Sequence, residues 1–417
     1  MNNQSTNSER IQAGLKKRYR AEKRFQYYGI TAIAIAIAFL LVMFAAIGIR
    51  GVGAFQQTHI ALTVTLDEAH VQDNDWQGIV KDGMRNAFPE VTSRRDKKLL
   101  YMVMSSGAGF DLQTLVKETP SLVGQTKTVW LPSSDDIDML MKGSIDRTVA
   151  ADDRRVSDKE IAWVDQFIAK DAIELHFNKR FFTGGDSREP ELAGILGAIM
   201  GSFYSLMVCF ILSFPLGIMS AMYLEEFAAK NKWTDLVEVN INNLAAVPSI
   251  VYGLLGMALF LNMFILPRSA PLVGGMVLAL MTLPTIIIAA RAALRAVPPS
   301  IREAALGIGA SPVQTVLHHV MPLALPGMLT GTILGMARAL GETAPLLMIG
   351  MVAFIVDVPT GIMDPATALP VQIFLWADSP ERAFSERTSA AIIVLLVFLI
   401  TMNISATLLR KMFERRW

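Results

Sequence analysis

The chain has 417 residues, of which 52% are hydrophobic and only 18% are charged, a composition that excludes an ordinary soluble enzyme and indicates an integral membrane protein. The formal net charge of +1 says little about partners, because the charges are unevenly distributed along the chain. Residues 52–188 hold about half of all Asp, Glu, Lys and Arg, which predicts a soluble domain inserted into a membrane chain.

The chain begins with a basic segment, residues 1–28, and continues with the apolar stretch GITAIAIAIAFLLVMFAAIGI at 29–49. A helix needs about 20 apolar residues to cross the hydrocarbon core of a bilayer, and this stretch has that length. A cleaved signal peptide is the alternative, but its apolar core is typically only about 7 to 15 residues long. We therefore expect a first transmembrane helix that remains as an anchor.

The insert at 52–188 mixes the patterns of strands and helices. IALTVTL at 60–66 alternates apolar and small polar residues, and LLYMVMS at 99–105 and TKTVWLP at 126–132 are two further strand candidates. Apolar residues at three-to-four spacing, typical of helices, occur in three segments: DLQTLVKE, IDMLMKGS and EIAWVDQFIAKDAIELHF. The insert is therefore predicted to be an α/β domain.

No catalytic or metal-binding pattern stands out in the insert. Asp135, Asp136 and Asp138 follow a turn-like Pro-Ser-Ser and are candidates for a cation site, but a solvated face or a helix cap is the role we expect. The only cysteine, Cys209, lies in an apolar run, so no disulfide is expected.

After the insert, five further stretches approach the length and apolarity of a membrane span, which gives six transmembrane helices in all. These stretches are residues 194–224, 244–266, 272–290, 323–355 and 389–409. Pro and Gly recur inside them, which membrane helices tolerate because neighbouring helices satisfy the freed backbone groups.

The orientation follows from the basic residues of the short flanking segments. Sixteen Lys or Arg lie in 1–28, 225–235, 291–320 and 410–417, against three in the short segments on the other side: Arg268, Arg382 and Arg387. The positive-inside rule then predicts cytoplasmic N- and C-termini and an extracytoplasmic domain at 52–188, periplasmic in a Gram-negative bacterium.

One predicted cytoplasmic loop, residues 291–322, contains the small-residue sequence EAALGIGASPVQTVLHHVMP. We expect a short helix at 300–308, a break around Gly309 and Ser311-Pro312, and a second helical piece at 313–320. Small side chains would let another protein approach this backbone closely, and an ordinary connection between two spans is the alternative.

Several catalytic motifs are absent from the sequence. It contains no Gly-x-x-x-x-Gly-Lys-Ser/Thr loop, so we do not expect this chain to bind ATP through a P-loop, and it has no His-Glu-x-x-His or paired-cysteine metal site. His318 and His319 are adjacent, so they point to different sides of a helix, about 100° apart, and do not suggest a metal site.

The loop resembles the cytoplasmic loop of ABC importer permeases, with Glu-Ala-Ala, a Gly four residues after the second Ala, and HVMP in place of an Ile-x-Leu-Pro ending. His319 and Met321 depart from that pattern at the exit of the loop. In the family this loop is a coupling helix that docks in a groove of the ATPase subunit. The resemblance assigns the ATPase-coupling role to Glu303, Ala304, Ala305 and Gly309.

A second resemblance extends from about residue 190 to the C-terminus. AIMGSFYSLMVCFILSFPLGIMSAMYLEEFA (198–228), ARALGETAPLL (337–347) and LPVQIFLWADSPERAF (369–384) resemble the A-type permease of the phosphate-specific ABC importer. The long insert is similar to extended variants of that family. The resemblance implies a type I ABC importer permease core at 190–410 within an α-helical polytopic membrane protein of the bacterial inner membrane.

The family resemblance also implies the partners: a homologous second permease, an ATPase dimer, a periplasmic phosphate-binding protein, inorganic phosphate and membrane lipid. Neither a cofactor nor nucleic acid is expected, and the chain is expected to transport rather than to catalyse. Two alternatives are a permease for another oxyanion, such as sulfate or molybdate, and a membrane-anchored sensing or assembly protein.

Arg338 and Glu342 interrupt the fifth apolar stretch. A charge at the centre of a membrane helix costs about 2.5 to 3.5 kcal/mol on insertion scales, so such charges normally pair or face an aqueous path. At i and i+4 these two share one helix face and can pair with each other. One interpretation is a structural ion pair; the other is that Arg338 supplies positive potential to an anion translocation path and Glu342 orients it.

Overall fold

The computed structural model of the protein describes residues 3–413. The prediction of cytoplasmic chain ends concerns in part residues 1–2 and 414–417, which lie outside the described residues. The chain falls into two units, residues 1–50 and 51–417, and each is described by itself.

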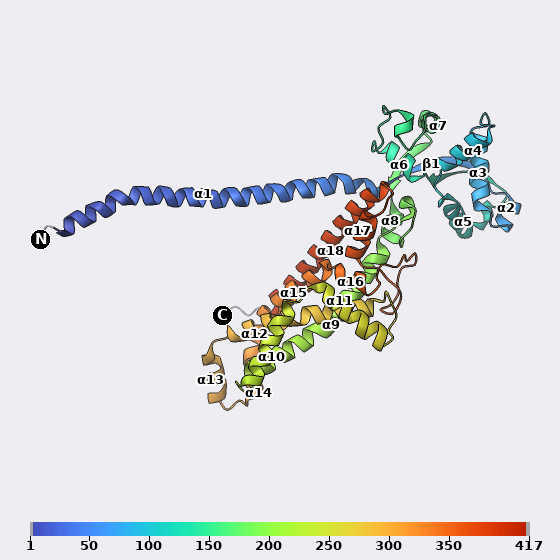
Figure 1. Ribbon diagram of the computed structural model, residues 1–417. Helices are drawn as coiled ribbons and strands as arrows, with labels where there is room; N and C mark the ends of the chain where they lie inside the picture. The colour runs from blue at the N-terminus through green and yellow to red at the C-terminus, as the bar shows by residue number, and fades with distance from the viewer. Residues whose placement is uncertain (1–2, 414–417) are drawn as a thin grey trace. The chain divides into compact units, whose positions relative to one another are not determined.

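The first unit is a single helix, α1 (Asn3–Gly51; Figure 1). It joins the predicted basic segment and the first apolar stretch without a break, because none of its 49 residues is a proline that would interrupt the hydrogen-bond ladder. Its C-terminal part, within Arg18–Phe55, is long and apolar enough to cross a membrane, and the large apolar side chains there are exposed, as expected of a helix surrounded by lipid.

The inserted domain is built on a three-stranded antiparallel sheet in the order β2-β1-β3. The strands are β1 (Gln56–Thr65), β2 (Thr126–Pro132) and β3 (Ile173–Phe177). In the register, Thr65 pairs with Thr126 on one side of β1 and Gln56 with Phe177 on the other. The prediction of an α/β insert is confirmed, with the strands at 60–66 and 126–132 among its elements.

Seven helices accompany this sheet: α2 (Glu68–Gln72), α3 (Trp76–Ala87), α4 (Arg94–Met102), α5 (Ala108–Glu118), α6 (Asp135–Met141), α7 (Asp158–Ala169) and α8 (Lys179–Thr183). Alternation along β1 directs Ile60, Leu62 and Val64 into the core beneath the helices, where each is at most 1% exposed. The residues of opposite parity, including His59, point to the other face of the sheet, which stays partly exposed.

One strand assignment from the sequence was wrong, and one strand was missed. Residues 99–105 lie mostly in helix α4, and only Met104 forms an isolated bridge to Ser133. The missing strand is β3, which the sequence analysis had included in a helical segment. Helix α7 ends at Ala169, and Asp171 turns the chain with φ +50° before the alternating residues of β3 begin.

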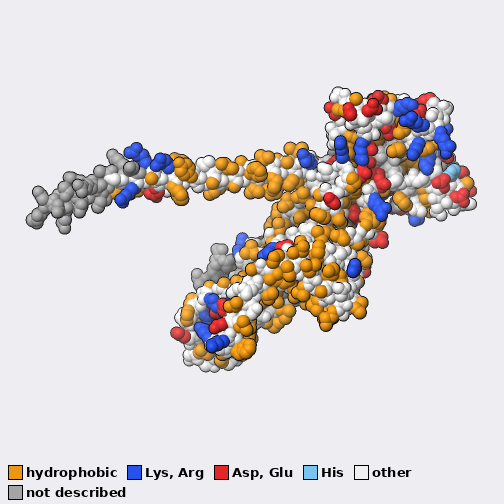
Figure 2. All heavy atoms as spheres, viewed as in Figure 1, with side chains coloured by type: hydrophobic (Ala, Val, Ile, Leu, Met, Phe, Trp, Pro, Cys, Tyr) orange, Lys and Arg blue, Asp and Glu red, His pale blue; other side chains and the backbone are white. Residues whose placement is uncertain are grey.

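The membrane body contains four long apolar helices, α9 (Leu196–Met222), α12 (Pro271–Arg295), α15 (Met321–Gly341) and α18 (Ala383–Phe413). With α1, they are the five described helices that are long and apolar enough to span a bilayer, and a sixth span results if the bent pair α10 (Lys232–Ala245) and α11 (Ser249–Gly256) is counted as one. Hydrophobic side chains cover this body, whereas charges gather on the inserted domain and around the loop between α12 and α15 (Figure 2).

Two of the predicted spans differ in detail. The stretch 244–266 is not one straight helix, because the chain bends by 100° between α10 and Ser249–Met263, at a break that ends in Pro248. The stretch 323–355 is helical only to Gly341; after a short break come α16 (Ala344–Met348) and an irregular segment that leads to α17 (Leu369–Ala377).

Small residues bring the membrane helices close together. A Cβ atom on Gly275 of α12 would lie only 2.5 Å from Cβ of Val208 and 2.6 Å from the carbonyl oxygen of Ser205, both on α9. Close approach at small residues is the usual way in which membrane helices gain packing energy, because burial of apolar surface gives little driving force in lipid.

A buried polar cluster joins the inserted domain to the first turn of α18. Lys142 donates to Asp138 Oδ2 at 2.6 Å and to Glu386 Oε1 of α18 at 2.9 Å. Asp138 also accepts hydrogen bonds from the backbone and the hydroxyl of Thr58 on β1, both at 2.8 Å. Asp138 is 5% exposed and is therefore part of this joint rather than of the solvated face that we expected.

Candidate functional site

The loop between α12 and α15 contains a short helix, α13 (Pro299–Gly307). Pro299 occupies the first helical position, where its missing N–H is not needed. The helix ends in a Schellman motif: the N–H of Gly309 donates to the carbonyl of Leu306 at 2.9 Å, and the N–H of Ala310 donates to that of Ala305 at 3.1 Å. Gly309 has φ +91°, a conformation that explains why glycine occupies the predicted break.

The chain becomes helical again at Ser311. Its hydroxyl accepts from the N–H of Gln314 at 3.3 Å, and the Gln314 side chain accepts from the Ser311 N–H at 2.9 Å, which is a capping box. From there α14 (Pro312–Gln314), a π-helical segment Thr315–Val320 and α15 form one 30-residue helical span. The non-helical connection is thus shorter than the predicted 291–322, and the exposed His318 and His319 lie in the first turns of the span.

The side of α13 that faces away from the membrane body is exposed and mostly apolar. Glu303 and Ala304 are exposed, whereas Ala305 is only 3% exposed and holds the helix against the body. Around them we define the α13 surface as the exposed residues Ala304, Leu306, Ile308, Gly309 and Val313, of which Ile308 is 81% exposed. An apolar patch beside backbone without bulky side chains is suited to docking another protein closely.

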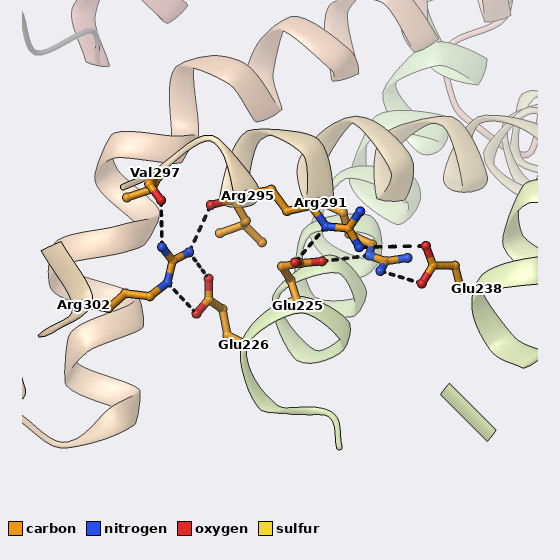
Figure 3. A network of polar contacts seen from close by, with 8 residues as sticks. Glu225, Glu226, Glu238, Arg291, Arg295, Val297 and Arg302 are labelled. Atoms are coloured by element: carbon orange, nitrogen blue, oxygen red, sulfur yellow. Dashed lines mark hydrogen bonds and ion pairs between the residues drawn. The ribbon is translucent and has the colours of Figure 1, made fainter. Parts of the chain in front are cut away.

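Arg302 ties α13 to the body (Figure 3). Its guanidinium forms a bidentate ion pair with Glu226 near the C-terminal end of the α9 span, at 2.5 and 3.1 Å. It also donates to the carbonyls of Val297 at 2.8 Å and Leu294 at 3.0 Å, at the C-terminal end of α12. The hydrogen bonds to Glu226 raise the pKa of the Arg302 guanidinium, so Arg302 stays charged at every physiological pH.

A second group of charges continues the same network beneath the loop. Arg291 of α12 donates to Glu225 at 3.2 Å and to Glu238 of α10 at 2.9 Å, and Arg295 donates to Glu225 at 2.8 Å (Figure 3). Ion pairs therefore link the C-terminal ends of the α9 span and of α12 to the middle of α10 and to α13. This network was not predicted. The sequence indicates it only by two arginines one helical turn apart at the end of one apolar span and by a Glu-Glu pair at the end of another.

Arg338 and Glu342 lie at the end of α15. Arg338 is in its last turn, and Glu342 is the first residue beyond it, with an extended backbone (φ −78°, ψ 122°). Arg338 Nε and Glu342 Oε1 are 3.4 Å apart, so the pair forms, although Glu342 is not on the helix as the i,i+4 argument assumed. The Arg338 side chain is 54% exposed in this single chain, so the pair leaves a cationic group on an open face of the body.

Within residues 3–413, no group of three or more His, Cys, Asp and Glu side chains could hold a metal ion. Asp135 and Asp136 are in the first turn of α6, and burial raises the pKa of both carboxyls. Asp136 lies 3.7 Å from Arg155, and Asp138 is used by Thr58 and Lys142.

Two family models match this chain, one in its N-terminal part and one in its C-terminal part. Residues 213–417 match the model described as binding-protein-dependent transport system inner membrane component, which includes most of the membrane body. Residues 12–151 match a domain of unknown function, DUF3333, which includes most of α1 and a large part of the inserted domain.

The phosphate transport system permease protein PstA 1 of Mycobacterium tuberculosis is 33% identical over 230 residues, 55% of this chain and 74% of the relative. PstA of Haemophilus influenzae is 28% identical over 54% of this chain and 78% of its own length, and the probable ABC transporter permease YqgI of Bacillus subtilis is 29% identical over 57% and 84%.

Among solved structures, the MetNI methionine ABC transporter in an inward-facing conformation matches 53% of this chain and 95% of that chain, at 17% identity and a TM-score of 0.42. This likeness is too weak to support any argument about residues.

Proposed function

The chain belongs to the PstA-like permeases of phosphate ABC importers, and from this premise we propose that it forms half of the translocation path for inorganic phosphate in such an importer. The observation that carries the proposal is the 33% identity to a phosphate transport permease over 74% of the relative's length. A homologous second permease would supply the other half of the path, and a periplasmic phosphate-binding protein would deliver the ion.

ATP hydrolysis would take place in a separate ATPase dimer, because this sequence has no P-loop motif. The α13 surface would dock in a groove of that ATPase, with Glu303, Ala304, Ala305 and Gly309 in or beside the contact. Two features support the docking: the surface is small and apolar, and Arg302 fixes the helix that carries it to the ends of α9 and α12. ATP-driven closure of the dimer would then move these helices and open the path alternately to each side.

Arg338 would contribute to the path itself. A permease half exposes the surface that faces its partner and the substrate, and the 54% exposure of Arg338 beside Glu342 is consistent with that location. The guanidinium would attract the phosphate anion. Glu342, with its carboxylate 3.4 Å away, would orient the guanidinium and weaken its hold on the ion, so that phosphate can leave.

Uptake of labelled phosphate in cells that lack this gene and in cells that regain it tests the proposed function. We expect uptake to be restored, and excess unlabelled phosphate to compete where sulfate and molybdate do not. Competition by sulfate or molybdate in place of phosphate would assign the permease to another oxyanion. Restored expression without any oxyanion uptake would favour the sensing or assembly protein.

The proposed orientation puts the loop with α13 in the cytoplasm and residues 52–188 in the periplasm. The basic residues of the sequence support it, with sixteen on the proposed inner side against three in the short outer segments. A reporter fused near Gln125, which lies in the inserted domain just before β2, should be active only if it is of a type that works in the periplasm. Activity of a cytoplasm-only reporter there would overturn the orientation.

A further inference from the structure

The open face of the sheet in the inserted domain carries a pocket that the transport function does not use. Its volume is about 630 Å³, within the range of roughly 300–1,000 Å³ that is usual for sites of small organic ligands. Three aromatic side chains form its floor, one from each strand: His59, Trp130 and His176. Asp111 of α5 and Lys179 and Arg180 of α8 stand beside them.

The floor is an ordered set of rings. The imidazoles of His59 and His176 stack with their centroids 4.8 Å apart and an angle of 16° between their planes, and the Trp130 ring centroid lies 5.0 Å from that of His176. These side chains are on the face of the sheet opposite the core, so packing of the domain does not require them. An exposed floor of aromatic rings suits the flat or CH-rich part of an organic ligand.

The charge of the pocket favours an anion. Arg180 forms an ion pair with Asp111, whereas no carboxylate of the described residues lies within ion-pair distance of the Lys179 ammonium. With neutral imidazoles, the residues named above leave one net positive charge. The His59 Nδ1–H donates to the Gln57 carbonyl at 3.1 Å, which leaves Nε2 available to a ligand. Glu174 is not among the residues that line the pocket, but its carboxylate lies 3.5 Å from Nε2 of His176 in the floor.

The pocket also lies where the chain passes into the membrane body. β1 begins directly after the short helix Val52–Phe55, whose Ala54 carbonyl accepts from Arg387 of α18 at 3.2 Å. Helix α8 likewise ends 13 residues before α9 begins at Leu196. A pocket in this position can be reached by the head group of a phospholipid as well as by a soluble anion.

We propose that this pocket binds a phosphate group, presented either by the head group of an anionic phospholipid or by a soluble phosphate. Lys179 provides an unpaired point charge, and Arg180 presents a planar fork that matches phosphate oxygens. The aromatic floor packs against the organic part that carries the phosphate. The site lies in the inserted domain, outside the helices that carry Arg338, and it does not depend on which anion the importer carries.

Binding can be tested on the full chain in a maltoside detergent, which contains no phosphate. Emission of Trp130 is the readout, and a Trp130→Phe variant provides the background of the other tryptophans. The probes are inorganic phosphate, glycerol 3-phosphate and, in a separate arm, transfer of the protein into nanodiscs of phosphatidylglycerol. Lys179→Gln removes the unpaired charge, and Lys81→Gln is the matched control because Lys81 is exposed on α3, over the covered face of the sheet.

We expect a saturable response to at least one probe, weaker by about tenfold in Lys179→Gln and unchanged in Lys81→Gln. A response to glycerol 3-phosphate or inorganic phosphate in detergent identifies a soluble ligand, and a response only on transfer to phosphatidylglycerol identifies a head group. No response in any arm, or equal responses in Lys179→Gln and the wild type, would overturn the proposal. The assay measures no transport, so its outcome is independent of the proposed function.

Discussion

Arg302 is the residue whose loss should separate α13 from the membrane body. α13 has a single fully buried side chain, Ala305, and one partly buried apolar side chain, Ile301, so apolar packing contributes little to holding it. Polar contacts of Arg302 hold the helix instead. Its guanidinium forms an ion pair with Glu226 and donates hydrogen bonds to the carbonyls of Leu294 and Val297, which precede α13 in the chain. Arg302→Gln should therefore release α13 while the rest of the body stays folded.

The size of the effect follows from these contacts. Removing one member of a buried ion pair destabilises by about 3–5 kcal/mol, because the remaining charge has no partner. Glu226 is only 9% exposed, but the Arg302 side chain is 24% exposed, so water compensates in part. We expect the free energy of opening α13 to fall by about 2–3 kcal/mol, which corresponds to an opening equilibrium about 30- to 150-fold larger.

Hydrogen–deuterium exchange measures this opening directly. The amides of Ile308, Gly309 and Ala310 donate to carbonyls inside α13 and exchange only when the helix end opens. Their exchange should accelerate by the stated factor in Arg302→Gln, with little change in α9 and α12. Arg295→Gln is the matched control, because Arg295 is 56% exposed and both its carboxylate partners lie outside α13.

In the double variant of Arg302→Gln with Glu226→Gln, the free energy of opening α13 should fall by less than the sum of the two single effects, because either single change already removes the ion pair. Equal exchange of the α13 amides in Arg302→Gln and Arg295→Gln would refute the reasoning. So would strict additivity of the two changes, since the ion pair would then contribute nothing.

Three further predictions concern other parts of the chain. Gly309→Trp should abolish co-purification with the ATPase, whereas Gly124→Trp, also at a positive φ with open space around it but in the inserted domain, should preserve it; retention by both would remove the docking role. Burial raises the pKa of the Glu191 carboxyl from 4.5 to about 7, so the Tm of the protein should decrease as pH rises across that interval. Glu191→Gln should make this decrease smaller, and a wild-type Tm that rises with pH would contradict the prediction. The swap Arg338→Glu with Glu342→Arg should assemble in the membrane but import phosphate poorly, and near-normal uptake would leave the two as a structural pair.

The spans and the soluble insert could be predicted from the sequence because long apolar runs and charge density are strong signals. The strands of the insert were harder. LLYMVMS at 99–105 has the composition of a strand, but the charged run that precedes it forms the first turns of α4, and the helix continues through Met102. IELHF, which forms β3, has only five residues and follows a true helix, so its alternation was hidden in a longer helical pattern.

The ends of the membrane helices depended on local chemistry that the sequence did contain. Ser311 and Gln314 form a capping box, and Pro312 occupies the first helical position, so the span that contains α15 starts at Pro312 rather than near Pro322. The ion pairs beneath the loop could not be predicted in the same way. Glu226 and Arg302 are 76 residues apart in the chain, and only the packing of α9 beside α12 brings them together.

These contacts determine which helices would respond first if the ATPase moved α13. Its polar contacts reach the end of the α9 span through Glu226 and the end of α12 through two carbonyls, and α9 and α12 are packed closely enough that Gly275 has no room for a side chain. α13 also packs against the π-helical segment Thr315–Val320, which begins the same 30-residue span as α15. Because Gly331 of α15 likewise has no room for a side chain against Ala289 of α12, a displacement of α13 would shift α9, α12 and α15 together, and Arg338 with them.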